Sequence, residues 1–95
     1  MKFWSVIKYK PKAGCEDEFV EALQRLNKMF EGRRECHCIR LPTGEFTELV
    51  RYENIDQMMA LQVEGLTWLD SVDHLLELYD ENSRTDAFSG NELDF

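Results

Sequence analysis

Apolar residues follow two different spacings along the chain, and these spacings predict an alternation of strands and helices. Residues 2–10 (KFWSVIKYK) are rich in aromatic and β-branched types and stop at Pro11, which predicts a strand. From 14 to 31 the apolar positions recur at helical spacing, and acidic residues occupy the first turn, which predicts an amphipathic helix. The apolar positions of this helix are Phe19, Ala22, Leu23, Leu26, Met29 and Phe30.

Two further strands, 34–42 and 45–53, flank a turn signal at Thr43-Gly44 and predict a β-hairpin. A two-residue loop would place Cys38 opposite Leu49, and the side chains would then separate into two sets. One face would carry His37, Ile39, Leu41, Phe46, Glu48, Val50 and Tyr52, and the other Cys36, Cys38, Arg40, Thr47, Leu49 and Arg51.

The second half of the chain predicts two short helices and a last strand. Asn54 is expected to cap a helix over 55–63, which Gly65 would interrupt. Thr67 would cap a second helix, which would end at the DENS stretch, 80–83. One face of this second helix would carry Trp68, Leu69, Val72, Leu75, Leu76 and Tyr79. The first half of 84–94 is expected to form a strand; whether residues 84–95 pair within their own subunit or with a partner stays open at this point.

The order β-α-β-β-α-β predicts an α+β, ferredoxin-like domain over residues 1–95, with helices on one face of an antiparallel sheet. Both faces of that sheet would be apolar, since Trp4 and Val6 point one way while Phe3, Ile7 and Tyr9 point the other. Two helices cover one face only. The uncovered face predicts a homodimer that packs sheet to sheet.

Net charge, hydrophobic runs and cysteine content limit the binding partners and the cellular compartment that we expect. The 19 acidic and 11 basic residues give a net charge of −8, which disfavours nucleic acid and anionic membranes. No apolar run approaches a membrane span, and the N-terminal apolar run contains lysines and no cleavage site, so we expect neither membrane insertion nor a signal peptide. Three cysteines, an odd number, suit a reducing compartment, and we expect a cytoplasmic protein.

The segment Cys36-His37-Cys38 has the residue types of a metal site but not the spacing. On a strand the two thiols share a face and His37 points away from them. Structural zinc takes four nitrogen or sulfur ligands, and the remaining cysteine, Cys15, lies at the start of the first helix. We therefore expect no metal, and we expect all three cysteines to be packing residues.

His37 is the more interesting member, because the expected hairpin register places it diagonally across from Glu48 and on the face of Tyr52. A histidine beside a carboxylate is a candidate general base or acid, and Tyr52 or Tyr9 could hold a ligand oxygen. The alternative is that His37 and Glu48 lie at a solvated rim without a role. Arg40 and Arg51 would form an anion clamp if the faces were reversed; otherwise they reach past the helices to solvent.

Two stretches resemble a known superfamily. VIKYKPKAGCEDEFVEAL (6–23) is similar to the first strand, turn and acidic helix start of the dimeric α+β barrel proteins, and ELVRYENIDQMMALQ (48–62) to their third strand, cap and short helix. This superfamily, which includes antibiotic-biosynthesis-type monooxygenases, is ferredoxin-like in fold and encloses an apolar cavity between two sheets. Its haem-degrading branch uses an asparagine on strand 1 that is missing here, so we set haem aside.

The resemblance implies a cofactor-independent monooxygenase, or a related isomerase, that acts on a small aromatic or polyketide-like substrate without metal or flavin. The alternative is a non-enzymatic dimer that binds an apolar molecule, fatty-acid-like or aromatic, in its cavity. The candidate catalytic residues are His37, Glu48 and Tyr52, and the candidate ligand-binding residues are Tyr9, Trp68, Val50 and Ile39.

Overall fold

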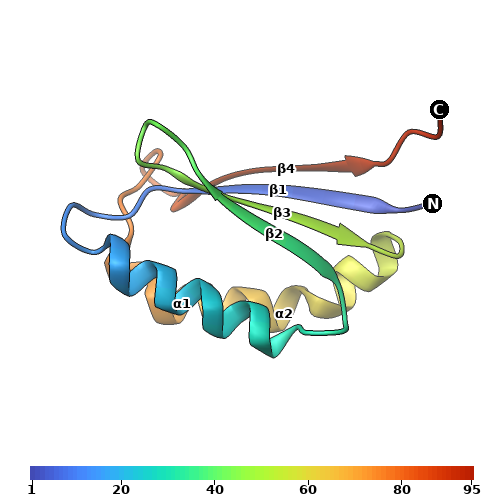
Figure 1. Cartoon of the computed structure of the whole chain (residues 1–95), viewed down its shortest axis with the longest axis horizontal. Helices are drawn as coiled ribbons and strands as arrows, with labels where there is room; N and C mark the ends of the chain where they lie inside the picture. Colours follow the sequence, from blue (N-terminus) through green and yellow to red (C-terminus); the bar gives the residue numbers. More distant parts are fainter.

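The computed structural model describes residues 1–95 and has the predicted order of elements. The elements are β1 (Phe3–Tyr9), α1 (Glu16–Met29), β2 (Glu35–Arg40), β3 (Phe46–Tyr52), α2 (Ile55–Val72), the 3-10 turn η1 (Asp73–Leu75) and β4 (Thr85–Asn91). The antiparallel sheet has the strand order β2-β3-β1-β4, and both helices lie on one face of it (Figure 1). This confirms the ferredoxin-like α+β fold. Neither helix has the length and apolar composition required to cross a membrane.

Helix α1 confirms the predicted amphipathic helix. Most of the apolar residues predicted to share one face pack against the sheet. Phe19, Ala22, Leu23 and Leu26 are buried, and acidic residues fill the first turn. The ring of Phe19 lies 5.2 Å from that of Tyr9 and 5.6 Å from that of Phe46, measured between centroids, which joins α1 to β1 and β3. Cys15 stands at the N-cap and packs half-buried against this core, as expected.

Helix α2 differs from the two short helices that were predicted. Asn54 caps it, since the Gln57 amide donates to Asn54 Oδ1 at 2.9 Å. The helix then runs unbroken through Gly65, because one glycine costs only about 1 kcal/mol in a helix that is packed against a sheet. The Thr67 hydroxyl donates to the Val63 carbonyl within the helix and does not cap a new one.

The helix also ends earlier than predicted, at Val72, and the chain then turns through η1. Leu75 and Leu76 are buried, but in a connection in which the Glu77 amide donates to the Lys10 carbonyl at 2.7 Å. Their helical spacing therefore reflected burial and not a continuation of α2. Strand β4 pairs antiparallel with β1 of its own chain, which settles the pairing of residues 85–91.

The register of the β2–β3 hairpin corrects the predicted faces. The Leu41 amide donates to the Glu45 carbonyl at 2.8 Å, so the loop has three residues, 42–44, and Gly44 takes a φ of 91°. Cys38 therefore pairs with Glu48 and not with Leu49. A shift of one residue moves every β2 side chain to the other face.

The corrected register defines two sheet faces. The helix-facing side carries Cys36, Cys38, Arg40, Phe46, Glu48, Val50 and Tyr52 from β2 and β3. The opposite side, here called the outer face, has no helix over it (Figure 1). A row of four side chains crosses the outer face from β2 to β4: His37, Leu49, Val6 and Phe88.

Candidate functional site

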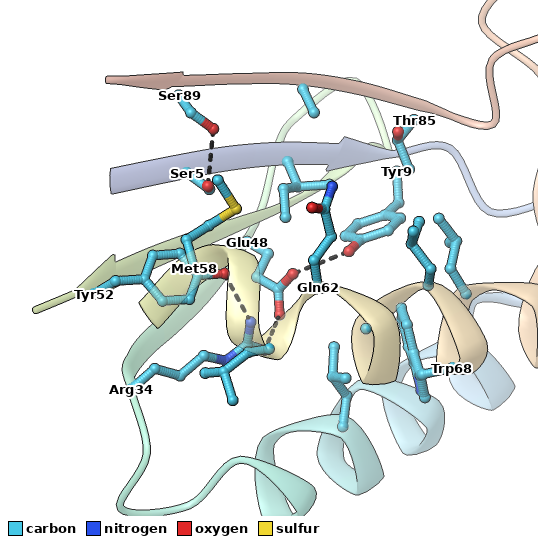
Figure 2. Close-up of a pocket in the computed structure, with 17 residues that line it drawn as sticks. Ser5, Tyr9, Arg34, Glu48, Tyr52, Met58, Gln62, Trp68, Thr85 and Ser89 are labelled. Atoms are coloured by element: carbon cyan, nitrogen blue, oxygen red, sulfur yellow. Dashed lines mark hydrogen bonds and ion pairs between the residues drawn. The ribbon is translucent and has the colours of Figure 1, made fainter. Parts of the chain in front are cut away.

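A pocket of about 270 Å³ lies between the helix-facing side of the sheet and α2 (Figure 2). Its walls are mostly apolar, and its polar groups gather on the sheet side. The lining residues are Ser5, Ile7, Tyr9, Leu26, Arg34, Glu48, Tyr52, Met58, Leu61, Gln62, Gly65, Leu66, Trp68, Leu69, Thr85, Ala87 and Ser89.

Glu48 is the central polar group of the pocket. Strand alternation places it between the buried Phe46 and Val50, and it is only 2% exposed. Its Oε1 accepts the Tyr9 hydroxyl at 2.9 Å, and its Oε2 accepts Arg34 Nη2 at 3.2 Å and the Cys36 thiol at 3.5 Å. A buried carboxylate is tolerated only when it is paired and hydrogen-bonded in this way.

Arg34 supplies the charge that balances Glu48. It lies in the segment between α1 and β2, and its side chain is 6% exposed. The guanidinium stacks on Phe30 at 4.3 Å from the ring centroid, which aims it into the pocket. Its second donor, Nη1, reaches the Tyr52 hydroxyl oxygen at 3.3 Å (Figure 2).

The two tyrosines keep their protons at neutral pH. Burial raises the pKa of Tyr52, and the pKa of Tyr9 is raised well above its ordinary value by burial and then by the adjacent Glu48 charge. The Tyr9 proton is committed to Glu48. Tyr52 instead accepts from Arg34, so its own proton is directed to no protein acceptor and is available to a ligand oxygen.

The walls come from α2 and the sheet. Trp68 is fixed by its indole N–H, which donates to the Ala22 carbonyl on α1 at 3.0 Å. Met58 and Gln62 extend from α2 into the pocket, and Gln62 points toward the sheet (Figure 2). On the far side, the Ser5 and Ser89 hydroxyls form a hydrogen bond of 2.8 Å. A planar apolar molecule would therefore contact Trp68 and α2 while its polar edge met Tyr52.

Four of the seven residues proposed from sequence meet in this pocket: Glu48, Tyr52, Tyr9 and Trp68. His37 and Ile39 do not. The three-residue loop turns them to the outer face, so the expected neighbourhood of His37 and Glu48 is wrong. Val50 lies on the helix-facing side, but it is fully buried and does not line the pocket.

Arg34 is a charged pocket residue that was not predicted from the sequence. It belongs to no strand or helix, so no periodicity marks it. The usable signal was Glu48 itself, because a carboxylate between two buried positions of a strand requires a cation. The arginine clamp considered from sequence is also wrong. Arg40 lies over Phe46 on the helix-facing side, whereas Arg51 pairs with Glu92 on the outer face.

The two cysteines of β2 are less buried than predicted. Cys36 is half-buried, Cys38 is exposed, and both lie on the helix-facing side beside Glu48. The interaction between the two thiols lowers the pKa of Cys38 and, together with burial, raises the pKa of Cys36. The thiols of Cys36 and Cys38 and the Glu48 carboxylate are also the group of side chains in this fold best suited to hold a metal ion.

The sequence matches no family model and no curated protein. Solved structures match the fold. Rv0793 of Mycobacterium tuberculosis superposes with a TM-score of 0.81 at 13% identity, covering 100% of this chain and 98% of that chain. A candidate antibiotic biosynthesis monooxygenase from Nitrosomonas europaea also gives 0.81 at 13% identity, covering 97% of this chain and 90% of that one.

A NIPSNAP family protein of unknown function from Agrobacterium tumefaciens is similar over 99% of this chain and 90% of its own, with a TM-score of 0.69 and 13% identity. The chain thus has the fold of antibiotic-biosynthesis-monooxygenase-like proteins, which confirms the resemblance read from the sequence. Likeness at this level of identity establishes the fold and no particular activity.

Proposed function

We propose that the pocket binds a small aromatic or polyketide-like molecule and that the protein oxidises it as a cofactor-independent monooxygenase. The observation that carries this proposal is the Tyr52 hydroxyl. It accepts from Arg34 and has its own proton free inside a pocket with mostly apolar walls. A group of this kind binds an oxygen that becomes negatively charged during a reaction.

The pocket suits a ligand of two or three fused rings. Its volume of about 270 Å³ lies just below the usual range of ligand sites, about 300 to 1,000 Å³, so the ligand must be small. Trp68, Leu66 and Leu69 offer apolar contact to a ring system, and Tyr52 meets an oxygen at its edge. Arg34 donates to the Tyr52 hydroxyl that would bind the ligand oxygen. Its positive charge therefore favours the enolate form of the ligand over the neutral form.

The reaction that fits this arrangement converts a methylene beside the rings into a carbonyl. The enolate forms by loss of a carbon proton to water, and its carbon then donates electrons to dioxygen. In total one methylene group and one dioxygen molecule give one carbonyl group and one water molecule. The carbon loses four electrons and dioxygen gains four; one oxygen atom enters the carbonyl and the other leaves as water with both hydrogens. The substrate itself is the reductant.

We also propose that two copies pair through their outer faces in a reducing compartment such as the cytoplasm. The row of Leu49, Val6 and Phe88 supports the pairing, since Phe88 on one edge strand is 61% exposed and Ile39, on the same face at the opposite edge strand, is 47% exposed. Aromatic and aliphatic side chains on a sheet face are stabilised when a second sheet covers them. The three free thiols suit such a compartment.

A second candidate function is binding without chemistry. Glu48 is the pocket's one carboxylate, and Tyr9, Arg34 and Cys36 all donate to it. No free side-chain base therefore faces the ligand. A substrate that does not lose a proton readily in water would be held and not oxidised, which favours a carrier of an apolar small molecule.

Oxygen uptake distinguishes the two functions, with dithranol, a dihydroxyanthrone, as the probe. An oxygenase should consume oxygen above the buffer rate, and Tyr52→Phe should lower this rate by about 10²-fold, the cost of removing one donor to a developing oxyanion. Tyr79→Phe is the matched control, since Tyr79 donates to Glu45 outside the pocket. Saturable binding of dithranol without protein-dependent uptake would support the carrier; neither binding nor uptake would refute both.

A further inference from the structure

Cys36, Cys38 and Glu48 form a compact cluster of metal-ligating groups at the open edge of the sheet. One ligand atom from each lies within 4.8 Å of the other two. The cluster exists because the three-residue hairpin loop pairs Cys38 with Glu48 across the ladder and leaves Cys36 two residues along the same face. From the sequence we expected no zinc site because only nitrogen and sulfur ligands were counted; the corrected register adds the Glu48 carboxylate on the face of the two thiols.

The spacing is close to that of a tetrahedral site. Ligand atoms around zinc lie about 3.3 to 3.8 Å apart, as follows from metal–ligand distances of about 2.0 to 2.3 Å. Cys36 Sγ is 3.5 Å from Glu48 Oε2 already. The remaining adjustment is within reach of χ1 rotations of Cys38, whose side chain is exposed on an edge strand.

A disulfide is the competing use of the pair, and the strand disfavours it. Residues i and i+2 of a strand have Cα atoms about 6.6 Å apart, whereas disulfides prefer about 5.5 to 6 Å. Closing the bridge would buckle β2 next to its ladder with β3. Binding one ion between the two thiolates requires no such movement of the backbone.

The net charge of the cluster becomes zero when it binds a divalent cation. Two thiolates and one carboxylate carry three negative charges, and Arg34, which donates to Glu48 Oε2 at 3.2 Å, contributes one positive charge. A divalent ion brings this group to neutrality. Tyr9 holds the other oxygen, Oε1, so the carboxylate keeps its orientation when a metal takes Oε2.

The fourth position has both access and a polar neighbour. An open hollow of about 500 Å³ along α1 reaches Cys36 and includes Asn27. The Asn27 amide nitrogen lies 4.0 Å from Cys38 Sγ, and the oxygen of the same amide, Oδ1, is buried with no hydrogen-bond partner. This oxygen is suited to accept from a water on the metal, or to ligate it directly.

We propose that Cys36, Cys38 and Glu48 form a binding site for a thiophilic divalent ion of the zinc and cadmium type, with water or Asn27 in the fourth position. Two sulfur ligands and one oxygen ligand favour these ions over magnesium or calcium, which take oxygen ligands. The site shares Glu48 with the pocket, but its test does not depend on the proposed oxygenation, because metal binding alone is measured.

The test is titration of the reduced protein with Cd²⁺ alone, followed by the ultraviolet charge-transfer absorbance of cadmium–thiolate bonds. One ion per chain is expected, and Zn²⁺ should displace it. Cys36→Ser and Cys38→Ser should each weaken binding by at least about tenfold, since even groups behind the ligands contribute that much. Cys15→Ser is the matched control and should bind like the parent, because Cys15 lies at the start of α1 outside the cluster.

Glu48→Gln should keep the thiolate absorbance with weaker affinity. This variant alters a buried group, so circular dichroism must first show that it is folded. Cys38 is exposed, so Cys38→Ser tests the metal site even if Glu48→Gln does not fold. Three results would overturn the site: Cys38→Ser binding like the parent, Cys15→Ser losing the ion, or native mass spectrometry finding one ion per two chains. An intrachain disulfide in Cys15→Ser under glutathione buffer would also overturn it, in favour of a redox pair.

Discussion

Arg34 Nη2 lies 3.2 Å from Glu48 Oε2, and the two side chains are 6% and 2% exposed, so the pocket contains an ion pair almost fully removed from water. Such a pair adds little stability by itself, because desolvation offsets the Coulombic attraction. The ion pair instead fixes the positions of neighbouring side chains. Glu48 holds Arg34 and Tyr9, and Arg34 holds Tyr52, which turns one buried carboxylate into a fixed set of donors.

Removal of Arg34 should be far more damaging than removal of its neighbour in sequence. Arg34→Met leaves Glu48 charged and unpaired in the core, which should lower the free energy of unfolding by about 3 to 5 kcal/mol. Arg33→Met removes the exposed pair with Glu64, a long hydrogen bond to the Met29 carbonyl and a contact with the Phe30 ring, and it should change little. Urea unfolding of the two variants makes the comparison. Equal effects would mean that Glu48 does not depend on Arg34.

The three-residue hairpin loop and the continuous α2 predict opposite effects at two glycines. Gly44 has a φ of 91°, so Gly44→Ala should destabilise the protein by about 1 to 2 kcal/mol. Gly65 lies inside α2, where an added methyl group would meet nothing within 4 Å, and Gly65→Ala should stabilise it by about 0.5 to 1 kcal/mol. Thermal unfolding reports both signs. Destabilisation by Gly65→Ala would argue against a continuous α2.

Acid should weaken the attachment of the end of β4. Glu92 accepts from Arg51 Nε at 2.9 Å and from Trp4 Nε1 at 2.8 Å, and these bonds, Arg51 first, lower the pKa of Glu92 in the folded protein. Its contribution is therefore present above the unfolded pKa, near the ordinary value of 4.5, and is lost as the pH falls through the lower folded value.

The corresponding test compares Glu92→Gln with the parent by urea unfolding at neutral and acidic pH. The parent should be the more stable at neutral pH, and its advantage should shrink below about pH 4.5. Glu81→Gln is the control, because Glu81 is exposed and lies outside the ion pairs of the fold. A difference between Glu92→Gln and the parent that does not change with pH would contradict this assignment.

Pairing of two outer faces predicts a charge-sensitive dimer. Leu49 stands beside Val6 in the middle of the outer face, so Leu49→Glu should convert the dimer into monomers without unfolding it. Met59→Glu is the matched control, since Met59 is 58% exposed on α2, on the other side of the sheet. Light scattering during size exclusion gives the masses. A monomeric parent would refute the pairing.

The order of elements could be predicted from the sequence because each element has its own hydrophobic period. Within one strand the prediction of faces was also sound: Glu48 and Tyr52 do share a side. Across strands it failed, because Pro42-Thr43-Gly44 supports a loop of two or three residues and sequence alone does not select one. His37 was assigned to the wrong face for that reason alone.

Two other features could not be read from local pattern. Arg34 lies in an irregular segment, and only the tertiary fold brings it to Glu48. The end of α2 was misplaced because Leu75 and Leu76 continue its apolar spacing while they are buried in a connection. In both cases long-range packing, and not local propensity, determines the position.

The proposed function requires that the pocket between the sheet and α2 hold a small aromatic molecule at Tyr52. The most direct measurement is a titration with dithranol under argon, followed by tryptophan fluorescence of Trp4→Phe, in which the pocket residue Trp68 is the sole tryptophan. We expect saturable quenching at one molecule per chain, with an affinity about tenfold or more lower in Trp4→Phe/Tyr52→Phe, as loss of one hydrogen bond implies. Quenching that does not saturate, or that is unchanged by Tyr52→Phe, would contradict it.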